Sequence, residues 1–410
     1  MRQDVMEQAL KKSTGQVSNL LNQLNESATL AMARKSRELA QQGIDVVSLS
    51  LGEPDFDTPD FIKDAAKTAL DQNITHYPPV NGILEVRKAV AAKFKRDNGL
   101  DYTADQVIIS TGAKQSIANT VYALVNPGDE VIMPSPFWVS YAELVKLAGG
   151  IPVMLNATVE NDFKITPAQL EAAINKKTKL IIYSSPCNPT GSVYSQSELK
   201  AFAEIILRRE DLYVISDEIY ELINFSGKTS SIAAIPGMEE RTITVNGVSK
   251  AFAMTGWRIG YIGAPKWIAD ACNKMQGQIT SGANSIAQMA TIAAVSAEPE
   301  IVKPMIETFR KRRDLVYQLL KEIPGVVTNL PEGAFYFFPD VSAYFGKSDG
   351  ETTIRNATDL STFLLEKEHV AVVTGEAFGD ENCIRISYAA SEDVLREAMK
   401  RIKNGLARLS

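Results

Sequence analysis

The chain has 410 residues, of which 45% are hydrophobic and 22% charged, as in ordinary globular proteins, and this length is enough for two buried cores. The net charge of −6 and the lack of a long basic run argue against a nucleic-acid partner. No apolar run is long enough to span a bilayer, and the first residues lack the apolar core of a signal peptide, so we expect no membrane partner.

The cysteines and histidines also narrow the chemistry. The three cysteines are odd in number and far apart, which suggests neither a disulfide framework nor a cysteine-rich zinc site and fits a reducing, cytoplasmic location. His76 and His369 are too few for a multi-histidine metal site, and neither stands near a persuasive serine nucleophile signature. We therefore expect no metal and no histidine-based hydrolase.

The N-terminal part predicts an arm followed by a helix. Residues 1 to about 25 are polar with scattered leucines and predict an arm or a frayed helix. Ser27 and Thr29 adjoin the start of a helical pattern over 30–42, and either hydroxyl could cap that helix. A strand-like run follows and leads to Gly52, which permits either a close backbone approach to a ligand or a simple turn.

Helical periodicity returns over 60–72 and 83–97, on either side of a rigid connector that contains Tyr77. From Val107 onward, short and almost continuously apolar strands alternate with helices, a pattern typical of a largely parallel sheet buried on both faces. Ligands collect beyond the carboxyl ends of such strands, and the polar candidate residues between 110 and 260 fall there. The predicted strands are 107–109, 131–133, 179–183, 212–215, 242–245 and 261–263.

The C-terminal third predicts a smaller α+β domain. A long helical pattern over 298–322 carries four consecutive basic residues at 310–313, which we interpret as a solvated helix face. Shorter strands and a last helix follow, at 333–338, 370–373, 383–387 and 391–409. We predict three parts: an arm with part of the small domain at 1–60, a large cofactor-binding domain at 61–305, and a small domain at 306–410.

Lys250 and Arg258 suggest a cofactor. Lys250 follows a buried strand among small neighbours, where a lysine loses solvation and can act as an amine nucleophile. Arg258 offers a permanent fork of donors for a phosphate or carboxylate. The amine of Lys250 can bind an aldehyde, and the guanidinium of Arg258 can bind an anion. A cofactor that carries both an aldehyde and a phosphate is pyridoxal 5′-phosphate. Two surface charges on a loop would produce the same spacing.

The segment 247–260, Gly-Val-Ser-Lys-Ala-Phe-Ala-Met-Thr-Gly-Trp-Arg-Ile-Gly, resembles the lysine signature of class I aminotransferases. These are pyridoxal-phosphate enzymes of fold type I. The resemblance implies a large α/β domain with a mostly parallel sheet flanked by helices, a smaller α+β domain, and a homodimer with active sites at the interface. Further blocks resemble the family in its own order across nearly the whole chain, at 52–56, 77–78, 112–115, 135–141, 188–191, 216–220 and 384–388.

Several residues are candidates for holding the phosphate. Gly112, Ala113 and Lys114 open a helix after a strand, where free N–H groups and the helix dipole can seat a phosphate, although an ordinary turn would have the same pattern. The resemblance implies that Ser249 and Arg258 add donors to that phosphate. It also implies that Tyr77 crosses the dimer interface to the partner's cofactor phosphate, whereas by itself it would be a packing residue. Gly247 replaces a serine that some relatives have.

Other residues are candidates for the cofactor ring. Asp217 ends a strand, where a carboxylate can keep a pyridine nitrogen protonated or can cap a helix. The resemblance implies that Tyr220 and Asn188 donate to the ring's O3′ oxygen, and that Trp138 stacks near the ring or covers the substrate. Without the resemblance, Asn188 belongs to a turn and Trp138 to the core.

Arg385 lies in an apolar strand and needs a partner, either a substrate α-carboxylate or a structural ion pair. The resemblance implies that Gly52 contacts the substrate, and that Lys114, Ser27 and Thr29 bind its distal carboxylate. It implies transamination of an amino acid with a 2-oxo acid, in which Lys250 first binds the cofactor and then moves the α-proton.

L-Aspartate with 2-oxoglutarate is the predicted pair. Prephenate, aromatic amino acids and alanine remain alternatives. A pyridoxal-phosphate β-lyase or a non-catalytic cofactor-binding module would keep the fold and change the outcome.

Overall fold

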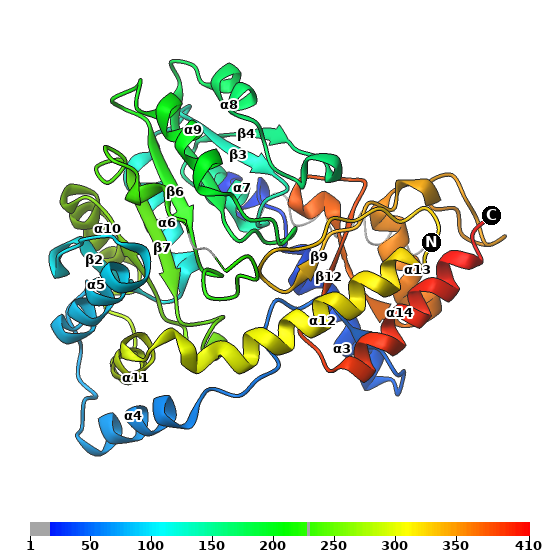
Figure 1. Ribbon diagram of the computed structural model, residues 1–410, viewed down its shortest axis with the longest axis horizontal. Helices are drawn as coiled ribbons and strands as arrows, with labels where there is room; N and C mark the ends of the chain where they lie inside the picture. The colour runs from blue at the N-terminus through cyan, green and yellow to red at the C-terminus, as the bar shows by residue number, and fades with distance from the viewer. Residues whose placement is uncertain (1–16, 228–229) are drawn as a thin grey trace.

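A seven-stranded, mostly parallel sheet organises the larger part of the molecule (Figure 1). The computed structural model describes residues 17–227 and 230–410, so most of the predicted N-terminal arm, 1–16, lies outside the described residues. The strand order is β2-β8-β7-β6-β5-β3-β4, and only β8 runs antiparallel to its neighbours. The strands are β2 (Val107–Ser110), β3 (Glu130–Ser135), β4 (Ile151–Asn156), β5 (Thr178–Ser184), β6 (Tyr213–Asp217), β7 (Thr242–Gly247) and β8 (Gly260–Gly263).

Alternate side chains of these strands enter different cores, which explains their almost continuous hydrophobicity. In β3, Val131 and Met133 pack with the helices α6, α7 and α10, whereas Ile132 packs with α8 and α9 on the opposite face. The prediction of a mostly parallel sheet buried on both faces is confirmed. The prediction missed β4, an edge strand whose side chains are largely exposed and which contains Pro152, a residue that sheets tolerate at an edge.

The helices that begin at Ala28, Asp60, Leu84, Lys303 and Glu392 fall close to the five helical segments that the sequence predicts with bounds. The sequence predicts no bounds for the other described helices. Local side chains define several helix ends: Ser195 and Glu198, for example, form a capping box at the start of α9. None of the described helices is both long and apolar enough to cross a membrane. The helices are α2 (Asn19–Asn22), α3 (Ala28–Gln41), α4 (Asp60–Asp71), α5 (Leu84–Asn98), α6 (Ala113–Leu124), α7 (Ser140–Leu147), α8 (Pro167–Ala173), α9 (Gln196–Ile206), α10 (Lys266–Ile279), α11 (Ser285–Ser296), α12 (Lys303–Lys321), α13 (Ala357–Glu368) and α14 (Glu392–Ala407).

Two small sheets lie beside the large one. The strand predicted over 370–373 is wrong as a single element, because the chain divides at Val372: β10 pairs in parallel with β1, and β11 joins an antiparallel sheet of order β11-β12-β9. Helix α12 runs from the large sheet to these small sheets (Figure 1). Because one continuous helix joins the two parts, the boundary between them is not evident, and the predicted domain boundaries stay a prediction. The strands are β1 (Val47–Ser48), β9 (Tyr336–Phe337), β10 (Val370–Ala371), β11 (Val373–Thr374) and β12 (Ile384–Ser387).

The basic run at 310–313 in α12 is not a uniformly solvated face. Arg312 is buried and forms a bidentate ion pair with Asp55, with N–O distances of 2.6 and 2.8 Å. The reason is geometric: successive residues of a helix are rotated around its axis, so four consecutive residues cannot all face solvent when one stripe packs against the core. The pair ties α12 to the loop that follows Gly52.

A buried polar network lies behind the turn that follows β6. Lys93 on α5 is 4% exposed, forms an ion pair with Glu221 and donates a hydrogen bond to Asn98 Oδ1 at 2.9 Å. Burial and the Glu221 carboxylate raise the pKa of Glu218 to about 8, and Ser231 donates to Glu218 at 2.7 Å. Because unpaired buried charges are costly, this network holds the turn firmly against α5.

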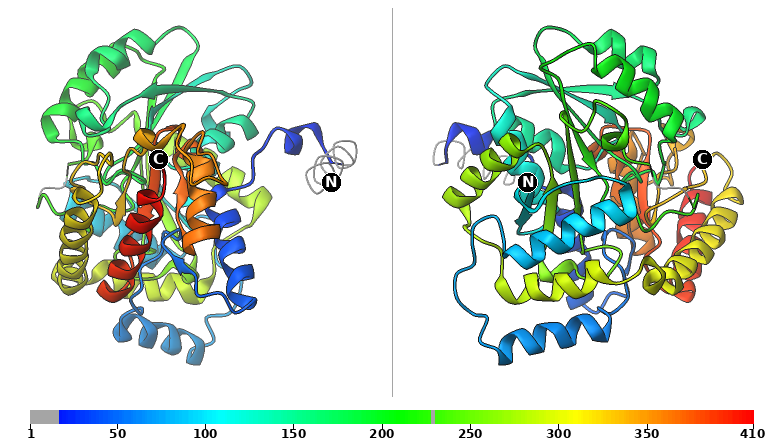
Figure 2. Two further views of the ribbon diagram at one scale, coloured as in Figure 1. Left: turned by 90° about the vertical axis from the view of Figure 1, so that its right-hand side faces the viewer. Right: turned by 60° about the vertical axis from the view of Figure 1, so that its left-hand side comes forward.

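Near the N-terminus, α2 stands clear of the rest of the described chain (Figure 2). The segment that follows returns to the molecule through Asn25. Its backbone N–H and side-chain amide donate to the two carboxylate oxygens of Glu143 on α7, at 3.1 and 3.4 Å. These contacts place the start of α3 next to the beginning of α7.

Candidate active site

A cavity of about 350 Å³ opens beyond the carboxyl ends of β5, β6 and β7. Its size is within the range of small-molecule sites, and it lies where open parallel sheets collect their ligands. All predicted site residues except Gly112 and Tyr77 line it: Ser27, Thr29, Gly52, Ala113, Lys114, Trp138, Asn188, Asp217, Tyr220, Ser249, Lys250, Arg258 and Arg385. The described residues contain no group of three or more His, Cys, Asp or Glu side chains placed to hold a metal ion.

Lys250 follows β7 and projects its amine into this cavity. Its Nζ donates a hydrogen bond to the carbonyl oxygen of Gly52 and lies 5.7 Å from the centre of the Tyr220 ring. Burial, together with the positive charge of Arg385, lowers the pKa of Lys250 to about 8, although the Glu53 carboxylate opposes this. Near neutral pH the side chain therefore has a much larger fraction of free amine than an exposed lysine, as a nucleophile or a proton acceptor requires.

Asp217 is the last residue of β6 and is 4% exposed. Its Oδ2 accepts a hydrogen bond from the Tyr141 hydroxyl at 2.6 Å, and its Oδ1 accepts one from the Ile219 N–H at 3.2 Å. Burial nevertheless raises the pKa of Asp217 to about 6. A protonated nitrogen brought against this carboxylate would therefore be stabilised by it. Tyr141 lies within a block that resembles the family, but its role is not evident from the sequence.

The N-terminus of α6 forms a seat for an anion. Gly112 caps the helix with a φ of +83°, a conformation that favours glycine, and any Cβ there would overlap Arg258 Nη2. A Cβ on Gly260 would likewise overlap the backbone nitrogen of Ala113. No described residue accepts a hydrogen bond from the N–H of Ala113 or Lys114, so both donors are available at the positive end of the helix dipole.

The residues present fit pyridoxal phosphate. The seat at α6 suits a phosphate, with Arg258 and the Ser249 hydroxyl lining the same cavity, and Lys250 and Asp217 supply an amine and a carboxylate. Arg258 itself has a φ of +57° before β8 begins, and its guanidinium donates to the Thr255 carbonyl at 2.9 Å. At Gly247, a Cβ would lie 2.9 Å from the carbonyl oxygen of Ile259, so the missing serine coincides with a crowded backbone.

Arg385 on β12 is 2% exposed and presents a cation to the cavity. It donates to Asn188 Oδ1 at 3.0 Å and to the carbonyl oxygen of Ser50, while its Nε–H has no acceptor among the described residues. No carboxylate among the described residues lies within ion-pair distance of it. The structural ion pair that the sequence left open is therefore absent from the described structure, and the guanidinium can receive an external carboxylate.

Ser27, Thr29 and Lys114 also line the cavity. Ser27 occupies the N-cap position of α3, but its side chain accepts no capping hydrogen bond, so its hydroxyl is available for other partners. Lys114 lies with its ammonium 5.0 Å from the centre of the Trp138 ring, and burial, with the charge of Arg258, lowers its pKa. These groups can bind a second anion.

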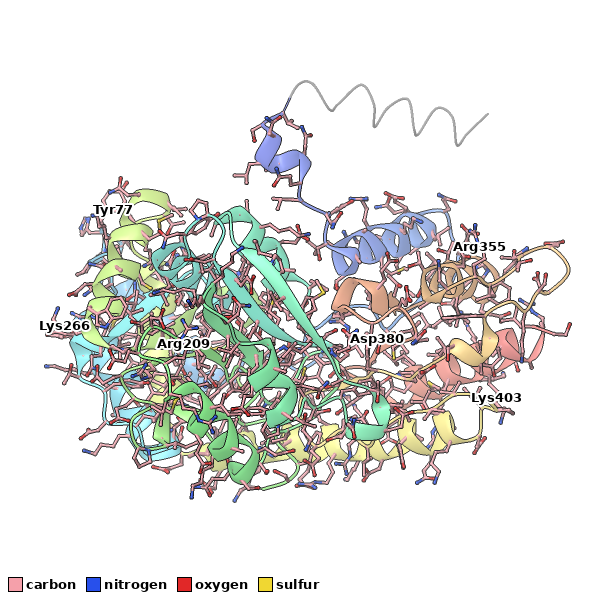
Figure 3. The ribbon with its side chains drawn as sticks, turned by 90° about the horizontal axis from the view of Figure 1, so that it is seen from above. Tyr77, Arg209, Lys266, Arg355, Asp380 and Lys403 are labelled. Carbon is pink, nitrogen blue, oxygen red and sulfur yellow. The ribbon has the colours of Figure 1, made fainter. Side chains whose placement is uncertain are left out.

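Of the two predicted residues that do not line the cavity, Gly112 adjoins the lining residue Ala113, whereas Tyr77 lies elsewhere on the surface. Its side chain is 99% exposed and lies at the periphery of the molecule, at the same end as Lys266 (Figure 3). It therefore cannot contact a ligand in the site of its own chain. Its predicted contact with the partner's cofactor stays a prediction.

Tyr336 lines the cavity and was not among the predicted site residues. It is fully buried in β9, and its hydroxyl lies 2.8 Å from the hydroxyl of Tyr220. In the sequence it belongs to a run of four aromatic residues, which indicates a buried strand and does not show which ring faces a ligand. Glu53 and Thr255, which hydrogen-bond to each other, also line the cavity and were not predicted.

The chain is similar to aminotransferases of known activity and structure. The family described as aminotransferase class I and II matches residues 44–402. The sequence is 49% identical to the bifunctional aspartate aminotransferase and glutamate/aspartate-prephenate aminotransferase of Petunia hybrida, over 95% of this chain and 82% of that protein. It is 48% identical to the aspartate/prephenate aminotransferase of Cereibacter sphaeroides, over 96% of this chain and 99% of that protein. The crystal structure of the aspartate aminotransferase from Rhizobium meliloti superimposes with a TM-score of 0.93 and 40% identity, over 96% of this chain and 100% of that chain.

Because the pKa of Lys250 is low, its amine should become reactive at a lower pH than the amine of an exposed lysine. In protein freed of cofactor, modification of Lys250 by acetic anhydride should reach half its maximal rate near pH 8, because the amine loses its proton below its ordinary pKa of 10.5. Lys266 is a control in the same sample, since Asp270 raises its pKa. Peptide mass spectrometry across a series of buffers measures both rates. Equal midpoints for the two lysines would contradict the prediction.

Proposed function

Because the chain belongs to the class I and II aminotransferases, which depend on pyridoxal phosphate, we propose that it transfers the amino group of L-aspartate to 2-oxoglutarate. The products are oxaloacetate and L-glutamate. One observation carries the substrate assignment: two sets of side chains that can bind anions line the cavity that contains Lys250. Arg385 forms one set, and Lys114 with Ser27 and Thr29 forms the other. Such a pair suits a substrate with two carboxylates.

Bound pyridoxal phosphate supplies an electron sink that stabilises the charge developing at the substrate α-carbon. The N–H groups of Ala113 and Lys114, together with Arg258 and Ser249, would hold its phosphate. Asp217 would pair with its ring nitrogen, and the Tyr141 hydroxyl keeps the Asp217 carboxylate in position. Tyr220 and Asn188 would donate to its ring oxygen. Asn188 uses its Oδ1 to accept from Arg385, so its amide N–H groups remain for this contact.

Lys250 moves the proton. Its Nζ would hold the cofactor through its aldehyde group and would be free as an amine once an amino substrate occupies that position. The free amine would accept the substrate α-proton at Nζ, and a pKa of about 8 lets it both accept and release a proton near neutral pH. Arg385 holds the α-carboxylate, and Trp138 covers the cavity. The positions of both groups fix the α-carbon relative to Nζ.

A second candidate substrate is prephenate. The relatives from Petunia hybrida and Cereibacter sphaeroides carry prephenate in their names, and prephenate, like aspartate, bears two carboxylates. The same pair of anion-binding groups can therefore receive it. Alanine and aromatic amino acids lack a second carboxylate and would leave Lys114 without an anionic partner. The alternative activity on the same fold remains that of a β-lyase, which cleaves its substrate instead of transferring the amino group.

Half of the reaction can be observed alone. L-Aspartate added without a 2-oxo acid should replace the absorbance of the lysine-bound cofactor by that of the aminated cofactor, and 2-oxoglutarate should reverse the change. A β-lyase would instead release ammonia and leave the cofactor unaminated. Failure of wild-type protein to show lysine-bound absorbance after addition of pyridoxal phosphate would overturn the proposal. If the absorbance responds only to a monocarboxylic amino acid, the mechanism would stand and the substrate assignment would change.

Replacement of Lys114 by glutamine should weaken dicarboxylate selection. A hydrogen bond to a charged group contributes about 1.5–3 kcal/mol, so kcat/KM for L-aspartate should fall by about 10- to 100-fold. The value for L-phenylalanine should change far less, because that substrate has no second carboxylate. Steady-state kinetics with both substrates measure the ratio, and Lys266→Gln at the exposed surface is the matched control. An equal loss for both substrates would assign Lys114 to the cofactor alone.

We also propose that the protein acts in the cytoplasm as a homodimer. The fully exposed Tyr77 supports this, since its predicted role requires a second chain. In a mixture of Lys250→Ala and Tyr77→Phe chains, one site of each mixed dimer combines an intact Lys250 with an intact Tyr77. Cofactor-binding affinity of that site should therefore return to the wild-type value. A mixture that regains no site of wild-type affinity, or a monomeric mass by analytical ultracentrifugation, would refute the shared site.

A further inference from the structure

Tyr336 touches two residues of the candidate active site at once. Its hydroxyl lies 2.8 Å from that of Tyr220, on the turn after β6, and its ring centre lies 4.6 Å from the guanidinium of Arg385 on β12. Tyr336 pairs with Ser387 in the antiparallel register of β9 and β12, which fixes the strand that carries Arg385. It is fully buried and lines the cavity.

The ring holds Arg385 without using its donors. A carboxylate partner would neutralise the guanidinium and compete with a substrate carboxylate for the same N–H groups. An aromatic face attracts the cation through its quadrupole and accepts none of those N–H groups in the guanidinium plane. This agrees with the Arg385 Nε–H, which is buried without an acceptor. Phe378 lies 4.8 Å from the same guanidinium and adds a second aromatic face.

The hydrogen bond between the two hydroxyls limits where the proton of Tyr220 can point. Each phenol has one proton to donate, and each also has lone pairs that accept. If Tyr220 donates to the cofactor, the hydrogen bond between the two phenols must be donated by Tyr336. No other described residue is in hydrogen-bond contact with the Tyr336 hydroxyl. Donation by Tyr336 also polarises the O–H bond of Tyr220 and makes Tyr220 a stronger donor.

Gly52 makes room for this arrangement. A Cβ at residue 52 would overlap the Tyr336 hydroxyl, and the carbonyl oxygen of the same glycine accepts a hydrogen bond from Lys250. The absence of a side chain at residue 52 therefore allows the phenol and the amine to approach the same short segment of backbone.

We propose that Tyr336 is a positioning residue for this reaction: its hydroxyl directs the Tyr220 proton into the cavity, and its ring holds Arg385 with its donors free. The proposal rests on the proposed function, because that function assigns Tyr220 to the cofactor and Arg385 to the substrate carboxylate. It adds a residue that couples the two.

Tyr336→Phe tests the hydroxyl in the enzyme loaded with its cofactor. Tyr220 becomes a weaker donor to the ring oxygen, so the deprotonated form of the lysine-bound cofactor is less favoured and its spectroscopic pKa should rise by about 0.5. Tyr388→Phe is the matched control, since Tyr388 is equally buried but donates to the Ala334 carbonyl oxygen at 3.1 Å. An absorbance titration measures all three proteins. A wild-type pKa in Tyr336→Phe would overturn the role of the hydroxyl.

Maleate, a dicarboxylate without an amine, tests the ring. Its Kd, from the change in absorbance, should stay within about twofold of wild type in Tyr336→Phe, which keeps the ring, and rise by about tenfold in Tyr336→Met, which removes the ring. Circular dichroism confirms folding, and if the methionine variant does not fold, Tyr336→Leu replaces it. An unchanged Kd without the ring would overturn that role.

Failure of the proposed function gives a different result. Wild-type protein without lysine-bound absorbance would overturn both the function and this inference. If L-aspartate aminates the cofactor of the wild-type protein, and the Tyr336 variants have the wild-type spectroscopic pKa and the wild-type Kd for maleate, this inference alone would be overturned.

Discussion

The cavity is governed by positive charge that the protein does not neutralise. Four cationic side chains line it, Lys114, Lys250, Arg258 and Arg385, against two carboxylates, Glu53 and Asp217. Charges removed from water are costly without partners, so this surplus favours anionic ligands. A phosphate at the start of α6 and the carboxylates of a substrate would meet that need. Burial lowers the pKa of Lys250, and the positive charge of Arg385 lowers it further, so the surplus charge also contributes to amine reactivity.

In the turn after β6, some residues line the cavity and others belong to the buried polar network that holds the turn in place. Asp217 and Tyr220 line the cavity, whereas Glu218 and Glu221 enter the buried network with Lys93 and Asn98. Residues of one short turn thus belong to two polar environments. The cavity keeps its excess positive charge because the two glutamates face away from it. Their contacts with α5 fix the backbone from which Asp217 and Tyr220 project.

Sequence patterns predict much of this arrangement for clear reasons. A strand buried on both faces is apolar throughout, and polar residues at its carboxyl end stand out, so the sheet and the surroundings of Lys250 are visible in the sequence. The roles of Tyr336 and Tyr141 are not visible in the sequence, because an aromatic residue in a core segment has the same pattern whether or not its hydroxyl faces a ligand. The inward rotation of Arg312 depends on the packing of α12, and the role of Tyr77 depends on another chain. Neither follows from local periodicity.

The two sets of anion-binding side chains in the cavity are supported very differently. Arg385 is held by Asn188, Ser50 and two aromatic faces within the core, so its guanidinium is preorganised. Ser27 and Thr29 lie at the start of a peripheral helix, and the preceding segment is fastened to α7 through the contacts of Asn25 with Glu143. Under the proposed function, the group that binds the α-carboxylate therefore depends on contacts within the core, whereas part of the group that binds the distal carboxylate depends on the path of a peripheral segment.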